Sequence, residues 1–169
     1  QSRSSAASDV YKRQDINLLH DPFLMKDMKK VVEKIQNLKE HRIMILGDYD
    51  VDGTTSTAML YMYFKYMGYD LLYYIPDRYE EGYGVSEKAI DYAEINKVSL
   101  IITVDCGIKA IHQVDLSNSK NIEVVICDHH LPGEQVPNAF GILNPKQENC
   151  NYPFKELCGC GIAYKLITC

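Results

Sequence analysis

Three short runs of almost uninterrupted apolar residues are each followed by an aspartate, directly or after one glycine. They are RIMIL at 42–46, LIITV at 100–104 and IEVVIC at 122–127. Strands that are apolar on both sides are typical of parallel sheets covered by helices on both faces. Segments with helical signals separate the runs, so the sequence predicts an α/β fold with a mostly parallel sheet and helices on both faces.

The segments between these runs support the same fold class. Apolar residues recur at spacings of three and four from Pro22 to about Glu40, which predicts an amphipathic helix. A further strand is predicted at 71–75, and further helices are predicted at 54–67, from Ser86 to about 96, and at 109–117. Ligands of such sheets bind beyond the carboxyl ends of the strands. The residues that follow each strand are therefore the first candidates for a functional site.

Candidate metal ligands follow all three apolar runs. They are Asp48, Asp50, Asp52, Asp105, Asp128, His129 and His130. Carboxylates crowded at one edge of a sheet repel one another unless a cation neutralises them. Mixed Asp and His ligands suit manganese, magnesium or iron better than a structural zinc site. The number of carboxylates suggests room for two ions, which together would activate a water and neutralise the charge that builds on a phosphoryl group.

Other interpretations of these residues remain open. The segment DYDVDG at 48–53 is also a common kind of polar turn, and a lone histidine usually satisfies a local hydrogen bond. A calcium loop is excluded, because the position that requires glutamate is Met59 and a predicted strand precedes the aspartates. A zinc cluster is disfavoured by the unusual spacing of the four carboxyl-terminal cysteines, Cys150, Cys158, Cys160 and Cys169.

Charge and hydropathy limit the classes of function. The formal net charge of −5 gives no general attraction for nucleic acid, so a polyanionic partner would need local attraction or bound metal. No apolar run is long enough for a membrane helix, and a soluble cytoplasmic protein without a membrane partner is expected. Residues 1–14 are polar and resemble a translated sequencing adaptor, so we expect a non-native or disordered leader there.

The three motifs resemble those of a known family. GDYDVDGTTS, VDCGI and ICDHH occur in the order, and after the predicted strands, that are found in the DHH phosphoesterases. The flanking segments DPFLMKDM, YYIPDRYEEGYGVS, ILNPK and YPFKELCGCGIAYKL are similar to those of bacterial members that degrade single-stranded DNA from its 5′ end. The resemblance runs from about Leu18 to the last residue. It implies a metal-dependent exonuclease of DNA repair and recombination, with a helical segment at 15–41 and the DHH catalytic domain at 42–169.

The resemblance also implies a metal role for five residues. Asp50 and Asp52 would be ligands of different ions, with Asp48 beside them as a further ligand or charge partner. Asp105 would bridge the two ions, and His129 would ligate one of them. The implied cofactors are two divalent cations, Mn²⁺ or Mg²⁺.

Catalytic and substrate roles are implied in the same way. His130 would contact the scissile phosphate or assist proton transfer, and Asp128 would orient a histidine. Together with the bridging Asp105 these residues form the expected catalytic group. Arg78 would touch the substrate, although a solvated loop arginine is an equally good interpretation.

Some features of the family do not occur in this sequence. Members complete the site with a further aspartate after a segment like GCGIAYKL, and later domains clamp single-stranded DNA with basic grooves and stacking aromatics. We therefore expect a catalytic domain that is truncated at its carboxyl end and inactive or very weak alone. Cys158 stands where relatives more often carry serine. A monomer that works with a single-strand-binding protein or a helicase is expected from the resemblance.

Two other functions remain open. One is a DHH phosphoesterase that acts on short oligonucleotides, cyclic dinucleotides or pyrophosphate; the flanking segments disfavour it. The other is a noncatalytic DNA-binding relative without metal, which need not retain the full set of ligands. Comparing activity on long single strands with activity on dinucleotides would distinguish the first function from the exonuclease. Measuring Mn²⁺ binding would distinguish the second function from it.

Overall fold

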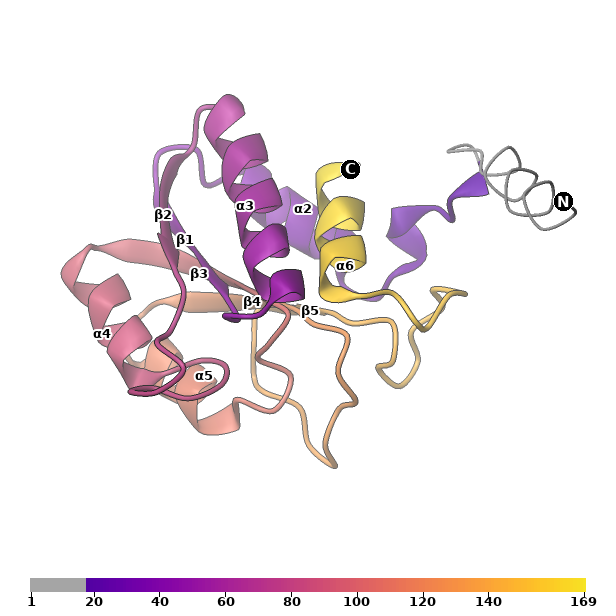
Figure 1. Ribbon diagram of the computed structural model, residues 1–169. Helices are drawn as coiled ribbons and strands as arrows, with labels where there is room; N and C mark the ends of the chain where they lie inside the picture. The colour runs from indigo at the N-terminus through magenta and orange to yellow at the C-terminus, as the bar shows by residue number, and fades with distance from the viewer. Residues whose placement is uncertain (1–17) are drawn as a thin grey trace, which may run out of the picture.

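The computed structural model of the protein describes residues 18–169. Five strands form one sheet in the order β2-β1-β3-β4-β5 (Figure 1). Their bounds are β1 (Arg42–Gly47), β2 (Asp70–Tyr74), β3 (Val98–Val104), β4 (Glu123–Cys127) and β5 (Gly141–Leu143). All neighbouring strands pair in parallel. The predicted α/β class is confirmed.

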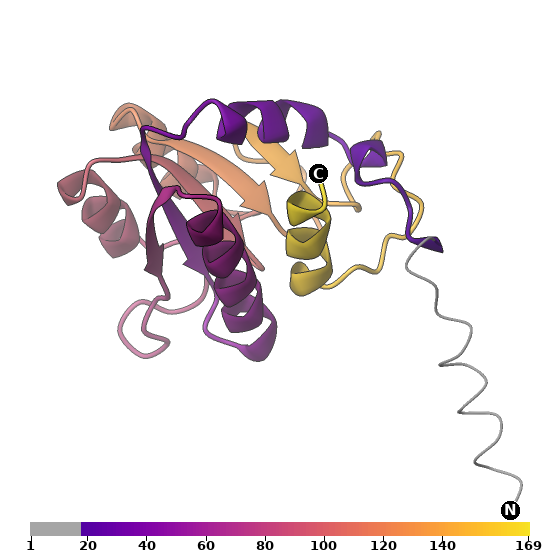
Figure 2. The same ribbon diagram turned by 90° about the horizontal axis from the view of Figure 1, so that it is seen from above.

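Helices cover both faces of this sheet (Figures 1 and 2). The first face packs against α2 (Met28–Gln36), α3 (Val51–Tyr66) and α6 (Gly159–Ile167), and the second against α4 (Glu87–Ile95) and α5 (Ile111–Ser119). Successive strand residues point to opposite faces, so Ile43 and Ile45 of β1 enter the first core while Met44 and Leu46 enter the second. Burial on both faces explains why the strands are apolar throughout.

The amino-terminal helix differs from the prediction. Instead of one helix from Pro22 to about Glu40, the chain forms the short 3-10 helix η2 (Pro22–Leu24) and then α2. Between them Asp27 has a left-handed backbone with φ 68°, and its carboxylate accepts a 3.0 Å hydrogen bond from the backbone of Ile142 in β5. This tertiary contact interrupts a segment whose apolar spacing alone would continue the helix.

The remaining predictions hold to different degrees. The strands predicted at 71–75, 100–104 and 122–127 are present, and Ser86 caps α4 by accepting from the backbone of Ala89 at 3.0 Å. β5 and α6 were not predicted as elements. The leader expected at 1–14 lies outside the described residues, as do the first three positions of the segment 15–41. In the described part of the chain, no helix is long and apolar enough to cross a membrane.

Candidate metal centre

Three aspartates lie side by side at the carboxyl edge of the sheet. Asp48, Asp105 and Asp128 are the first residues after β1, β3 and β4. Each donates its backbone N–H to a carbonyl of the next strand: Asp48 to Val104 at 3.4 Å, Asp105 to Cys127 at 2.9 Å and Asp128 to Leu143 at 3.1 Å. The hydrogen bonding between neighbouring strands thus continues for one residue beyond the strand ends. These backbone bonds hold the three aspartates next to one another.

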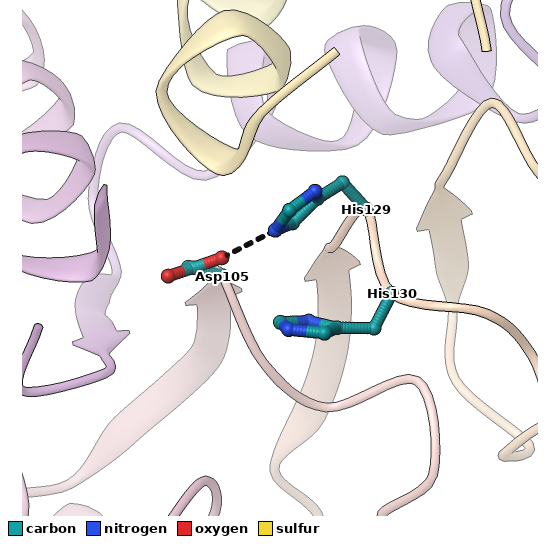
Figure 3. A group of neighbouring side chains, drawn as sticks. All are labelled: Asp105, His129 and His130. Carbon is teal, nitrogen blue, oxygen red and sulfur yellow. Dashed lines mark ion pairs between the residues drawn. The ribbon is translucent and has the colours of Figure 1, made fainter. Parts of the chain in front are cut away.

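Asp105 is the member that two groups of candidate ligands share. In one group, side-chain oxygens of Asp48, Asp50 and Asp105 all lie within 4.8 Å of one another. In the other, the same holds for an oxygen of Asp105 and ring nitrogens of His129 and His130 (Figure 3). Figure 3 shows the carboxylate facing the two imidazoles from the neighbouring strand end. Asp105 is thus a buried carboxylate that could contribute a ligand atom to either group.

The electrostatics of these carboxylates fit a cation. Among residues 18–169, the buried side-chain N and O atoms without a hydrogen-bond partner are Asp48 Oδ1 and Asp105 Oδ1, both in this cluster. Burial, with the nearby carboxylates of Asp52 and Asp50, raises the pKa of Asp105 to about 8. Burial also raises the pKa of Asp48. Buried carboxylate oxygens that accept no hydrogen bond are costly, and oxygens combined with imidazole nitrogens suit a divalent ion such as Mn²⁺.

The aspartate segment is a strand-to-helix junction. We predicted a loop followed by a helix from Thr54, but α3 begins at Val51. Asp50 is its N-cap, and Asp50 Oδ1 accepts a 2.9 Å hydrogen bond from the backbone of Gly53. This cap stabilises the start of α3 and fixes the Asp50 side chain at the edge of the site.

Asp52 lies in the first turn of α3 and contacts the start of α6. Its Oδ2 accepts from the backbone of Gly159 at 2.6 Å, and its Oδ1 accepts from that of Cys160 at 2.7 Å. Asp52 is in neither of the two ligand groups, although its Oδ2 lies 3.8 Å from His129 Nε2. The carboxylate therefore joins the aspartate segment to the first N–H groups of a helix, where negative charge is favoured.

The glycine-rich start of α6 allows this close approach. A Cβ atom placed on Gly159 would lie 2.9 Å from both Cβ and Oδ1 of Asp105. Cys158 is the N-cap of the helix, and its sulfur accepts from the backbone of Gly161 at 3.3 Å. The sequence GCG was the available signal that a backbone passes close to another group here.

Asp128 orients one of the two histidines. Asp128 Oδ1 lies 2.7 Å from His130 Nδ1, and its Oδ2 accepts from the backbone of Ile108 at 2.9 Å. Because a buried carboxylate beside Nδ1 favours the tautomer with the proton on that nitrogen, Nε2 of His130 is left as a free electron-pair donor. His129 Nε2 lies 3.1 Å from Asp105 Oδ1, at ion-pair distance (Figure 3).

The loop between β2 and α4 contributes two further residues. Arg78 is exposed, with its guanidinium carbon 5.0 Å from the centre of the Tyr49 ring, and it belongs to neither ligand group. Tyr83 was not predicted, yet its hydroxyl lies within hydrogen-bond distance of both Asp105 and His130. A cavity of about 300 Å³ opens beside His130 and is lined by Tyr83, Ile108 and neighbouring residues.

Comparisons with known proteins agree with this architecture. The model of the DHH family, N-terminal domain, matches residues 42–169. The single-stranded-DNA-specific exonuclease RecJ of Bacillus subtilis is 44% identical over 149 residues, covering 87% of this chain and 19% of that protein. RecJ of Escherichia coli is 40% identical, covering 83% of this chain and 25% of that protein.

Solved structures show the same relationship. The crystal structure of exonuclease RecJ bound to manganese superposes with a TM-score of 0.76 at 32% identity, covering 85% of this chain and 37% of that one. A RecJ from Thermus thermophilus in complex with Mn²⁺ superposes with a TM-score of 0.71 at 26% identity, covering 85% of this chain and 20% of that one. The chain thus spans between about a fifth and a quarter of the length of the two curated relatives above. This chain belongs to the DHH family.

Proposed function

We propose that this chain supplies the metal-binding part of an enzyme that hydrolyses phosphodiester bonds in single-stranded DNA, releasing nucleotides from a 5′ end during DNA repair and recombination. The observation that carries the proposal is the buried Asp105, which two groups of ligand atoms share and whose Oδ1 accepts no hydrogen bond within residues 18–169. Such an arrangement suits phosphoryl chemistry with two divalent ions. The choice of single-stranded DNA rests on similarity to the RecJ exonucleases, and the 5′ direction and the role in repair and recombination rest on the resemblance of the sequence motifs.

The carboxylates would divide between two ion positions. Asp48 and Asp50 would hold one ion and His129 the other, with Asp105 between them. The Asp52 oxygens each accept one backbone hydrogen bond and keep a second lone pair, so Asp52 would complete the shell near His129, 3.8 Å away. Bound Mn²⁺ or Mg²⁺ would supply a water of lowered pKa and neutralise charge on the phosphoryl group.

The remaining residues would hold the substrate and its protons. His130, with Nδ1 engaged by Asp128, would present Nε2 to the scissile phosphate as a contact or a proton carrier. Arg78 would approach a neighbouring phosphate, since its guanidinium is exposed and lies over Tyr49, the residue between Asp48 and Asp50. Local positive charge of this kind offsets the net charge of −5, which otherwise repels DNA.

The test uses the protein expressed from the complete open reading frame that contains this chain. Single strands labelled at either end are incubated with Mn²⁺, and degradation from the 5′ end is expected. Asp105→Ala should abolish hydrolysis, whereas Asp115→Ala, which changes an exposed residue of α5, should retain it. An Asp105→Ala protein with the unchanged rate would refute the assignment.

Two further measurements separate the alternative functions. Faster hydrolysis of dinucleotides than of long single strands would favour a phosphoesterase for small substrates. A folded protein that shows no Mn²⁺ binding in calorimetric titration would favour a noncatalytic DNA-binding relative.

The cellular context is part of the same proposal. By resemblance, the enzyme would be a cytoplasmic monomer that meets its substrate alongside a single-strand-binding protein or a helicase. Light scattering would test the monomer, and affinity capture from its own host with a tagged full-length protein would test these partners.

A further inference from the structure

The hydroxyl of Tyr83 joins two parts of the candidate centre that come from different strands. It donates to the backbone carbonyl of Asp105 at 3.1 Å and lies 3.2 Å from His130 Nδ1. Its ring meets the His130 ring edge-on, with the centroids 5.8 Å apart. We propose that Tyr83 is a positioning residue that fixes the His130 ring and the Asp105 backbone for metal and phosphate binding. The catalytic part of this inference rests on the proposed function.

The polarity of the hydrogen bonds assigns each group one role. Asp128 Oδ1 accepts from His130 Nδ1 at 2.7 Å, so the proton of the neutral ring is on Nδ1. The single O–H of Tyr83 is used by the Asp105 carbonyl, so toward His130 the Tyr83 oxygen can only accept, as the longer arm of a hydrogen bond from the one Nδ1–H that Asp128 mainly receives. His130 Nδ1 is thus contacted by both Asp128 and Tyr83, and Nε2 is left as the nitrogen with a free lone pair, while Figure 3 shows the ring beside Asp105 and His129.

The bond to Asp105 is made at a strained position of the chain. Asp105 has φ 61°, a left-handed backbone that residues other than glycine adopt rarely. Asp105 is also the carboxylate that the two ligand groups share. A hydroxyl that fixes the carbonyl of this residue helps to keep its side chain directed into the site.

The loop that carries Tyr83 has its own anchors. The Glu81 carboxylate accepts from the Tyr74 hydroxyl at 3.0 Å, from the backbone of Asp77 at 3.1 Å and from the Ser86 hydroxyl. These bonds fold the loop whether or not Tyr83 keeps its hydroxyl. Removing that oxygen alone therefore changes the positioning of the site while the loop retains its anchors.

The test compares Tyr83→Phe with Tyr79→Phe in the protein from the complete reading frame. Tyr79 lies in the same loop and is 91% exposed, so its variant controls for loss of a tyrosine hydroxyl. Nitrogen-15 NMR of the histidine rings reports the His130 tautomer without metal, calorimetry reports Mn²⁺ affinity, and steady-state kinetics report kcat and KM.

For Tyr83→Phe we expect shifted His130 ring resonances and weaker Mn²⁺ binding, with kcat lower by about tenfold at nearly unchanged KM, the effect of one lost hydrogen bond in a positioned site. Tyr79→Phe should match the parent protein in all three measurements. Unchanged His130 resonances together with unchanged kcat in Tyr83→Phe would overturn the inference. If the parent protein hydrolyses no DNA, the proposed function fails, whereas the NMR and calorimetric results still decide the role of Tyr83.

Discussion

Asp105 Oδ1 and His129 Nε2 lie 3.1 Å apart, although one residue follows β3 and the other belongs to the segment after β4. The pairing of these two strands in parallel register brings their carboxyl ends to one edge. The same Asp105 oxygen is buried and accepts no hydrogen bond from any residue of the described chain. The two side chains are close enough for an ion pair but form no hydrogen bond, an arrangement that suits two ligands of one metal ion.

Without metal, stability should fall as the pH rises. The pKa of Asp105 is raised from 3.8 to about 8 in the folded protein, so the neutral carboxyl is favoured there and the ionised one in the unfolded chain. Its stabilising contribution is complete below about pH 4 and is lost as the pH rises through about 8. Thermal melts in EDTA across this range should show a decreasing melting temperature.

Added Mn²⁺ should have the opposite dependence, because it binds the ionised carboxylate. The increase in melting temperature on adding Mn²⁺ should be larger at pH 8 than at pH 5.5. Asp105→Asn is the control, since the amide does not titrate: it should flatten the pH dependence in EDTA and remove most of the effect of Mn²⁺. Equal stabilisation of the two proteins by Mn²⁺ at pH 8 would contradict this explanation.

Gly159→Ala should destabilise the protein and weaken metal binding. The added Cβ would meet Cβ and Oδ1 of Asp105 at 2.9 Å, so α6 or Asp105 has to shift at a cost of roughly 1–3 kcal/mol. Gly161→Ala is the matched control in the same helix, because its Cβ would meet the flexible end of Leu157 at 3.0 Å. Chemical denaturation and Mn²⁺ titration of both variants check the difference, and equal losses would argue against a close fit at Gly159.

Cys158→Ser should stabilise α6. The sulfur of Cys158 caps the helix by accepting from Gly161 at 3.3 Å, and an oxygen at that position is a stronger acceptor. We expect a gain of about 0.5–1 kcal/mol in the free energy of unfolding. Cys160→Ser is the control: Cys160 lies two residues further along, within α6, and is not its N-cap, so this change should give no comparable gain. A melting temperature of Cys158→Ser at or below that of the parent would show that the cap contributes little.

The sequence predicted the features that follow from local pattern and sheet geometry. Apolar runs such as 100–104 indicated buried parallel strands, and the shared carboxyl edge of such strands indicated that Asp48, Asp105 and Asp128 would lie together. The same reasoning also explains why Asp48 Oδ1 and Asp105 Oδ1 accept no hydrogen bond within residues 18–169: a side chain at the end of a buried strand has little access to water.

Other parts of the site depend on tertiary contacts without a local signature. The hydrogen bonds from Gly159 and Cys160 to Asp52 join residues that are separated by 107 and 108 positions in the sequence. They require α6 to pack against α3. Tyr83 comes from a loop whose sequence has no periodicity. β5 has three residues, too few for a pattern to be recognised.

The most direct test of the account is the number of Mn²⁺ ions that the protein from the complete reading frame binds. Calorimetric titration, with metal analysis of the saturated protein, should give two ions per chain. In Asp105→Ala both ions should bind much more weakly, because the shared ligand is lost from each position. Two ions with unchanged affinity in Asp105→Ala, or binding of no ion by the folded parent protein, would contradict the claim that Asp105 joins two metal positions.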